Sequence, residues 1–145
     1  LIRSSVTDLA WLDSVTADQP VFVVAEGLMM YLPEAQGLAL LQRITRQFPS
    51  GQIAFDAYSG SMVRLVSRLA TVRGAQVELV WGIDDPRDLE LQVPGLRLVE
   101  DVSFLTMPEL VQRLAHNGFS RAMHGMLGRI GFYRRLVRHL LYAFG

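Results

Sequence analysis

Apolar runs and amphipathic stretches alternate along the first half of the chain. Residues 21–25, VFVVA, form a continuous β-branched and aromatic run, which is typical of a strand covered on both faces, as in a parallel sheet. Pro33 and Glu34 then suit the first turn of a helix. Pro-Ser-Gly at 49–51 ends it. Its apolar residues recur at helical spacing; they are Leu38, Leu41, Ile44 and Phe48.

A second strand and a second helix follow. Residues 52–57, QIAFDA, indicate a short buried strand, and Gly74 suits the C-cap of the helix that comes after it. The order strand, helix, strand, helix with short connections predicts a parallel α/β sheet with right-handed crossovers. The apolar face of the second helix consists of Met62, Val63, Val66, Leu69 and Ala70.

The pattern is less regular beyond Gly74. A strand is expected to end at Gly82, and residues 96–104 alternate well enough to predict another. Residues 106–118 predict a helix, because Thr106 suits its cap and an Asn-Gly pair its end. Residues 130–144 show apolar positions at helical spacing, but their last part also fits a strand, and periodicity leaves both open.

The composition is that of one globular domain. The chain has 145 residues, of which 50% are hydrophobic and 19% charged. Basic and acidic residues number 14 each, and this balance disfavours a nucleic-acid partner. No cysteine is present, and the three histidines have no metal-ligand spacing, so no metal site is expected. No apolar run is long enough to span a bilayer and the start does not resemble a signal peptide, so we expect a soluble, cytoplasmic protein.

Glu26 is the most conspicuous candidate for chemistry. It stands where the first strand ends, and Gly27 after it allows a sharp turn. Ligands of open α/β sheets bind beyond the carboxyl ends of the strands. A carboxylate there suits a cationic group of a small molecule, in a site walled by Met29, Met30 and Tyr31. The alternative is that Glu26 only ends the strand and reaches solvent.

Asp8 has a similar ambiguity. Residues 5–13 are predicted to form a loop and a short helical turn, with Thr7 or Asp8 as its N-cap. A carboxylate on a loop can instead accept a hydrogen bond from a ligand amine.

The other motifs give weaker evidence for a functional site. The acidic pairs 84–85 and 100–101 are expected to be solvated loop acids, since adjacent residues of an extended segment point to opposite faces and do not converge on one bond or metal. The glycines at 125, 128 and 131 lack dinucleotide-binding spacing and do not follow a strand. No catalytic triad or nucleophile elbow is recognisable, and the catalytic residues stay unknown.

Several blocks in a characteristic order resemble a known family. VFVVAEGLMMYLPEA is preceded by SSVTDLAWLD and followed by GQIAFDAYS and WGIDDPRDLE, which spreads the match over residues 4–105. These blocks resemble the leucine carboxyl methyltransferase family, in particular its bacterial branch, which is similar to polyketide O-methyltransferases. The resemblance implies an S-adenosyl-L-methionine-dependent enzyme that methylates a hydroxyl or carboxylate of a small molecule. It also implies an α/β fold with a partial Rossmann-like class I methyltransferase sheet.

The resemblance supplies roles for residues at matching positions. It implies that Asp8 and Leu9 border the adenine, with the acid accepting from the exocyclic amine. It implies that Glu26 faces the methionyl ammonium and that Tyr31 faces the methyl acceptor. The family requires no single invariant base, and the resemblance indicates none here.

The chain also departs from the family. Family members begin with a region that carries a glycine-rich cofactor loop, whereas this sequence begins at Leu1 in mid-pattern. We therefore expect residues 1–145 to be a single partial methyltransferase domain, the C-terminal half, inactive by itself. The absent strands would neighbour residues 21–25, so an unpaired apolar edge and self-association are expected. The alternative is a non-catalytic α/β module or degenerate paralogue that acts through protein association.

Overall fold

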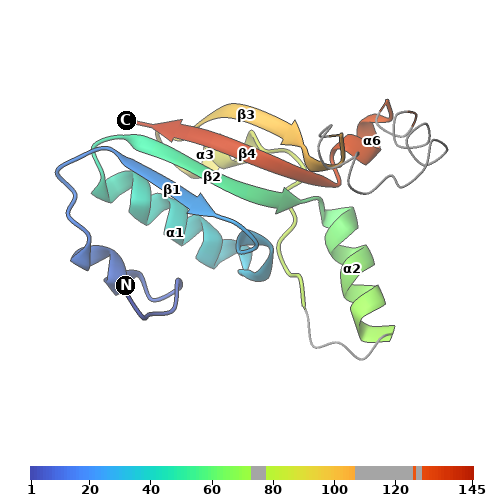
Figure 1. Cartoon of the computed structure of the whole chain (residues 1–145), viewed down its shortest axis with the longest axis horizontal. Coiled ribbons are helices and arrows are strands. Elements are labelled where there is room, and N and C mark those ends of the chain that lie inside the picture. The colour runs from blue at the N-terminus through green and yellow to red at the C-terminus, as the bar shows by residue number, and fades with distance from the viewer. Residues whose placement is uncertain (73–77, 107–125, 127–128) are drawn as a thin grey trace.

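The structure, a computed structural model, describes residues 1–72, 78–106, 126 and 129–145 (Figure 1). The predicted helix at 106–118, the C-cap at Gly74, and Gly125 and Gly128 lie outside these residues, apart from Thr106 at the helix start. The elements in chain order are η1 (Leu9–Ser14), β1 (Val21–Ala25), η2 (Met29–Tyr31), α1 (Glu34–Gln47), β2 (Gly51–Tyr58), α2 (Gly60–Val72), α3 (Asp88–Gln92), β3 (Arg97–Ser103), η3 (Phe104–Thr106), α6 (Gly131–Arg134) and β4 (Val137–Phe144).

The strands form one four-stranded sheet in the order β1-β2-β4-β3. β1 and β2 are parallel, as predicted, with Val21 beside Gly51 and Ala25 beside Phe55. β4 is antiparallel to both of its neighbours, so the sheet is mixed. The chain leaves β3 at Ser103 and enters β4 at the same end of the sheet, beside it at Arg138, which makes this pair antiparallel. The predicted α/β class is confirmed.

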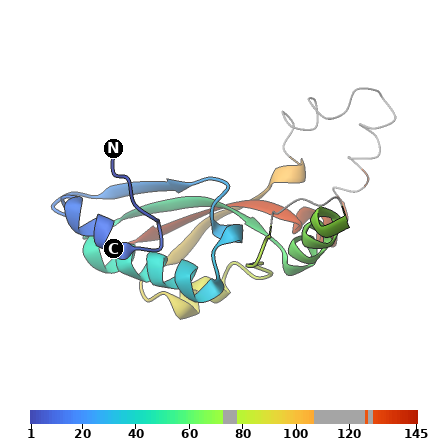
Figure 2. The same cartoon turned by 90° about the horizontal axis from the view of Figure 1, so that it is seen from below.

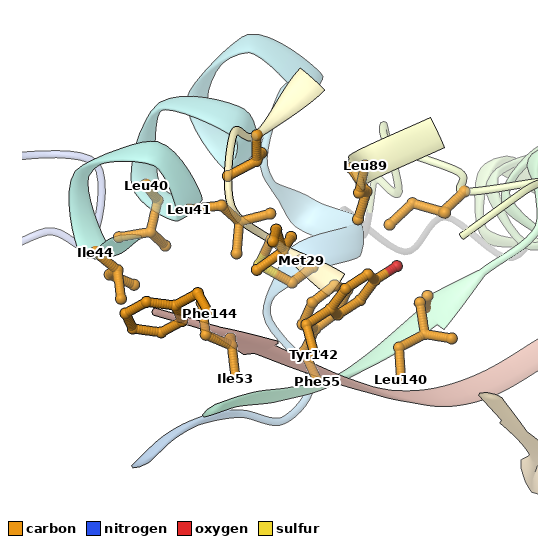
Figure 3. Close-up of a cluster of buried hydrophobic side chains, with 14 of the residues drawn as sticks. Met29, Leu40, Leu41, Ile44, Ile53, Phe55, Leu89, Leu140, Tyr142 and Phe144 are labelled. Atoms are coloured by element: carbon orange, nitrogen blue, oxygen red, sulfur yellow. The ribbon is translucent and has the colours of Figure 1, made fainter. Parts of the chain in front are cut away.

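α1 and α3 lie on one face of the sheet, as Figure 2 shows. Leu40, Leu41 and Ile44 of α1 are buried at helical spacing and pack on the side chains of β2 and β4 (Figure 3). Tyr142 and Phe55 stack nearly parallel in this core, with ring centroids 5.6 Å apart. Burying each large apolar side chain stabilises the fold by about 1.5–3 kcal/mol, so this one core ties α1 to the sheet.

The expected strand ending at Gly82 is wrong. Residues 78–87 form neither helix nor strand, although Leu79 and Trp81 are buried. The backbone N–H groups of Val80 and Trp81 both donate to the carbonyl of Met30, at 2.9 and 3.2 Å. The N–H of Ile83 donates to the carbonyl of Tyr58, the last residue of β2, at 2.8 Å. The segment is therefore held by single hydrogen bonds to η2 and β2 and forms no strand ladder.

The ambiguity at 130–144 is resolved in favour of a strand. A short helix, α6, precedes the eight-residue β4. Every residue of β4 is buried or half-buried, because the strand lies inside the sheet. Apolar residues on both faces of a central strand produce nearly continuous hydrophobicity, which matches helical spacing by coincidence.

The face of the sheet opposite α1 is open. Among the described residues no helix covers it (Figure 2). Phe22 and Val24 of the edge strand β1 point to this face and are 62% and 57% exposed. The prediction that residues 21–25 are covered on both faces is therefore wrong for the described structure, because β1 is an edge strand with one open face. In the described part of the chain, no helix combines the length and the apolar character needed to cross a membrane.

Candidate functional site

Glu26 lies at the carboxyl edge of the sheet. It directly follows β1, is exposed, and has no hydrogen-bond or ion-pair partner among the described residues. By the two-residue period of the strand it shares the open face with Phe22 and Val24. These three side chains line a shallow cavity of about 340 Å³ whose other walls come from β2, β3 and β4. The carboxylate is therefore available to a ligand on this side.

Gly27 gives the chain its turn after Glu26. Its φ of +61° is in the left-handed region that favours glycine. The N–H of Gly27 donates to Asp56 Oδ1 at 2.7 Å, which joins the end of β1 to the neighbouring end of β2. Since Ala25 pairs with Phe55, Glu26 and Asp56 are the next residues along two parallel strands. The hydrogen bond fixes the backbone on which Glu26 stands.

Sequence reasoning missed Asp56 as a site residue. The signal was present, because an acid follows the run VFVVA and another acid, Asp56, lies near the end of the run IAFDA. Two parallel strands with an acid at the same end bring those acids to the same edge of the sheet. Treating residues 52–57 only as a strand hid this relationship.

Tyr31 and Tyr58 complete this end of the sheet. Tyr31 lies in η2 and is exposed, whereas Tyr58 is the last residue of β2 and half-buried. Burial raises the pKa of Tyr58, and the nearby Asp56 carboxylate and Tyr31 raise this pKa further. Tyr58 therefore keeps its phenolic proton at neutral pH as a hydrogen-bond donor. The structure thus gathers Glu26, Asp56, Tyr58 and Tyr31 at one edge.

The two methionines after Glu26 are not exposed walls of a site, contrary to expectation. Met29 and Met30 are both buried. Met29 belongs to the main core under α1, whereas Met30 packs with Val63 and Leu79 in a second cluster. They anchor η2, so Tyr31 is the residue of this segment that reaches the surface.

Asp8 is the N-cap of η1. Its carboxylate accepts from the Ala10 N–H at 3.3 Å, and Leu9 is half-buried against the main core. η1 is attached to the C-terminal end of α1, where Gln47 donates to Leu12 and Arg43 forms an ion pair with Asp13. Glu26 precedes η2 at the other end of α1. No contact joins Asp8 to Glu26 in the described structure, and the cofactor roles of Asp8 and Leu9 stay predictions.

The acidic pairs do not converge. Asp84 accepts from Gly60 N–H and Asp85 from Arg87 N–H, each at 2.9 Å, so they order loops. Glu100 and Asp101 lie in β3 and not in a loop; Glu100 lines the open-face cavity and Asp101 approaches Arg138 on the other face. Within the described residues, no three acidic or histidine side chains are placed to hold a metal ion.

Curated proteins similar to this chain are methyltransferases. The tetracenomycin polyketide synthesis O-methyltransferase TcmP of Streptomyces glaucescens is 37% identical over 139 residues, which is 96% of this chain and 52% of that protein. The S-adenosyl-L-methionine-dependent methyltransferase dpfgK of Gibberella zeae is 38% identical over 108 residues, 69% of this chain and 36% of that protein. The chain spans about half the length of the first relative and about a third of the second.

A solved structure supports the fold. A DUF574 family protein from Streptomyces avermitilis superposes with a TM-score of 0.59 at 15% identity, over 98% of this chain and 53% of that one. No family model matches the chain. The narrower resemblance to leucine carboxyl methyltransferases is not confirmed by these comparisons. The relatives do show that this chain is homologous to a part of S-adenosyl-L-methionine-dependent and O-methyltransferase proteins.

Proposed function

We propose that this chain is part of an S-adenosyl-L-methionine-dependent O-methyltransferase and supplies one wall of its cofactor site. Its likeness to TcmP along 96% of its length supports the activity. The structural observation that carries the proposal is the exposed carboxylate of Glu26, which has no partner among the described residues, at the carboxyl edge of parallel strands on a turn held by Asp56.

The chemistry of these residues fits the cofactor. Glu26 offers a carboxylate that no described residue engages, which suits the ammonium of the methionyl group by a charge-assisted hydrogen bond. Asp8 is exposed and its bond to Ala10 is long, so its carboxylate can also accept from the adenine amine. Leu9 presents the apolar surface that would border the adenine ring.

The reaction would be an in-line methyl transfer to a small molecule. When bound, the cofactor supplies an activated methyl group whose bond to sulfur breaks as a bond to the acceptor oxygen forms. The residues of this chain would bind and orient both partners, and Tyr31 at the surface would face the acceptor. Hydroxyl and carboxylate acceptors both fit this scheme.

Three narrower statements belong to the same proposal. The chain would be of the leucine carboxyl methyltransferase type, would form part of a single methyltransferase domain, and would act in the cytoplasm. The sequence blocks quoted above and the partial coverage of TcmP support the first two. The even balance of charge supports a small-molecule partner over a nucleic acid.

The test is the Glu26→Gln variant of the intact protein that carries this chain. We expect the dissociation constant of S-adenosyl-L-methionine, measured by calorimetric titration, to rise by about 10- to 100-fold, the scale of a charge-assisted hydrogen bond. Glu34→Gln is the control, since Glu34 is also exposed but lies in the first turn of α1. Equal affinities of wild type and Glu26→Gln would show that Glu26 only ends a strand.

One observation favours the second function, association of chains. β1 is an edge strand of the described sheet and exposes Phe22 and Val24, and unpaired apolar edges promote pairing with another chain. A non-catalytic module would use this edge to bind a second copy. The Val24 variant discussed below tests this function without the cofactor.

A further inference from the structure

A second cavity lies on the core face of the sheet, away from Glu26. It has a volume of about 200 Å³ and opens where β3 ends and β4 begins. Ser103 and Arg138 face each other across these two strands in the sheet register. The remaining wall comes from α6 and the residue after it, with Arg134 and Arg135, and from Asp101 of β3.

The cavity wall is strongly positive. Arg134, Arg135 and Arg138 contribute three guanidinium groups, against one carboxylate from Asp101. Arg134 and Arg135 are exposed, and their guanidinium groups have no hydrogen bond or ion pair with any described residue. Arg138 approaches Asp101 at 3.5 Å, which is long for a hydrogen bond. The excess positive charge is therefore not neutralised within the described part of the fold.

Arg138 is an unusual side chain because it is 3% exposed. Its Nη2 donates to the carbonyl oxygens of Ile83 and Asp84, which fixes the guanidinium in place. Its Nε is buried and has no hydrogen-bond partner among the residues that the structure describes. A buried charged donor left unsatisfied is costly, and an ion or ligand group that accepts from it would remove that cost.

Ser103, on the neighbouring strand β3, also has a buried polar atom without a partner in the described residues. The residue is 6% exposed, and its hydroxyl oxygen is buried with no hydrogen-bond partner in the described part of the chain. Ser103 and Arg138 thus place an O–H and an N–H donor on adjacent strands at one cavity. An acceptor group that reached both atoms would satisfy the two donors, and the two exposed arginines line the same cavity.

We propose that this cavity binds a small oxyanion, the carboxylate or phosphate group of a ligand. Arg138 Nε and Ser103 Oγ would hold the anion at the base, and Arg134 and Arg135 would close over it from α6. The site uses none of the residues assigned to the cofactor and does not depend on the proposed methyl transfer.

The test is a titration of the intact, ¹⁵N-labelled protein with sodium phosphate and, separately, with sodium acetate, at constant ionic strength kept with sodium chloride. The readout is the Nε–Hε resonance of Arg138, so enzyme activity is not needed. We expect a saturable shift with at least one of the two anions. Saturation with phosphate alone supports a tetrahedral ligand group, and saturation with acetate alone supports a carboxylate.

Variants separate the site from general attraction to a basic surface. Arg134→Gln combined with Arg135→Gln should weaken binding by about tenfold or more, because two charge-assisted contacts are lost. Ser103→Ala should weaken it without unfolding the protein, since the hydroxyl has no partner to lose. Arg97→Gln is the control, an exposed arginine at the other end of β3. The absence of saturation with both anions, or equal weakening by Arg97→Gln, would overturn the proposal.

Discussion

The indole ring of Trp81 packs directly on the backbone of α1 at Gly37. A Cβ atom added to Gly37 would overlap the six-membered part of that ring. Both residues are buried, and this contact seats the irregular segment 78–87 against the helix. Gly37 lies inside a helix, where glycine costs about 1 kcal/mol relative to alanine, so the close approach explains its use.

Gly37→Ala should therefore destabilise the protein despite its better helix propensity. Overpacking of a buried contact costs about 1–3 kcal/mol, more than the gain in propensity. The free energy of unfolding from urea denaturation measures the net effect. In the Trp81→Leu background the same substitution should cost less or become stabilising; an equal loss in both backgrounds would contradict the contact.

Gly27→Ala tests the turn after Glu26. The expected loss of stability is about 1–2 kcal/mol, because an L-residue is strained in the left-handed region. An added Cβ has open space around it, so no steric clash contributes. Gly131→Ala is the matched control, since its Cβ also meets nothing and its φ is not positive. The two variants should differ in urea denaturation; equal stabilities would show that the turn relaxes freely.

Tyr142→Phe should change how stability depends on alkaline pH. The Tyr142 hydroxyl donates to the Pro86 carbonyl at 2.7 Å, and burial strongly raises the pKa of Tyr142 above its ordinary value. The unfolded chain releases this proton near pH 10, so wild-type stability is full below that pH and declines as the pH rises above it.

The Tyr142→Phe variant lacks the hydrogen bond, so its free energy of unfolding at pH 7 should fall by about 1 kcal/mol. Its ring still stacks on Phe55. The difference in unfolding free energy between wild type and variant should shrink between about pH 9 and 11, because the wild type loses stability there and phenylalanine does not titrate. Burial also raises the pKa of Tyr58 and Tyr133, yet both proteins share these groups and the difference isolates Tyr142. A deficit independent of pH, in urea denaturation at several pH values, would contradict the assignment.

Val24→Lys tests association through β1. We expect the 145-residue chain to form concentration-dependent oligomers in sedimentation velocity, and a lysine on the edge strand to suppress them. Leu91→Lys is the control, because Leu91 is 85% exposed but lies on α3, away from β1. A wild-type chain that stays monomeric at all concentrations would rule out self-association.

Local patterns predicted the type of each helix and strand in residues 21–72, but not that one face of β1 is open, and they failed further along where distant residues determine the path of the chain. β1, α1, β2 and α2 each turn one face toward the core, so the spacing of their apolar residues was enough to predict a helix or a strand. The path of residues 78–87 depends on the carbonyl of Met30, about fifty positions earlier, and no local pattern encodes that bond.

The candidate site was predicted in part for the same reason. Glu26 was identifiable from the end of a hydrophobic run. The pairing of Gly27 with Asp56 requires the register of two strands, and the cavity around Arg138 requires the antiparallel insertion of β4. Both depend on topology, which composition and spacing do not encode.

The central position of β4 has a consequence for synthesis on the ribosome. β2 and β3 are translated well before residues 137–144, yet each has β4 as its sheet neighbour on that side. Until these residues emerge from the exit tunnel, the edges of β2 and β3 that later pair with β4 have no partner strand. We expect translation intermediates that end before residue 137 to be clients of ribosome-associated chaperones, and the sheet to assemble only after β4 has been released.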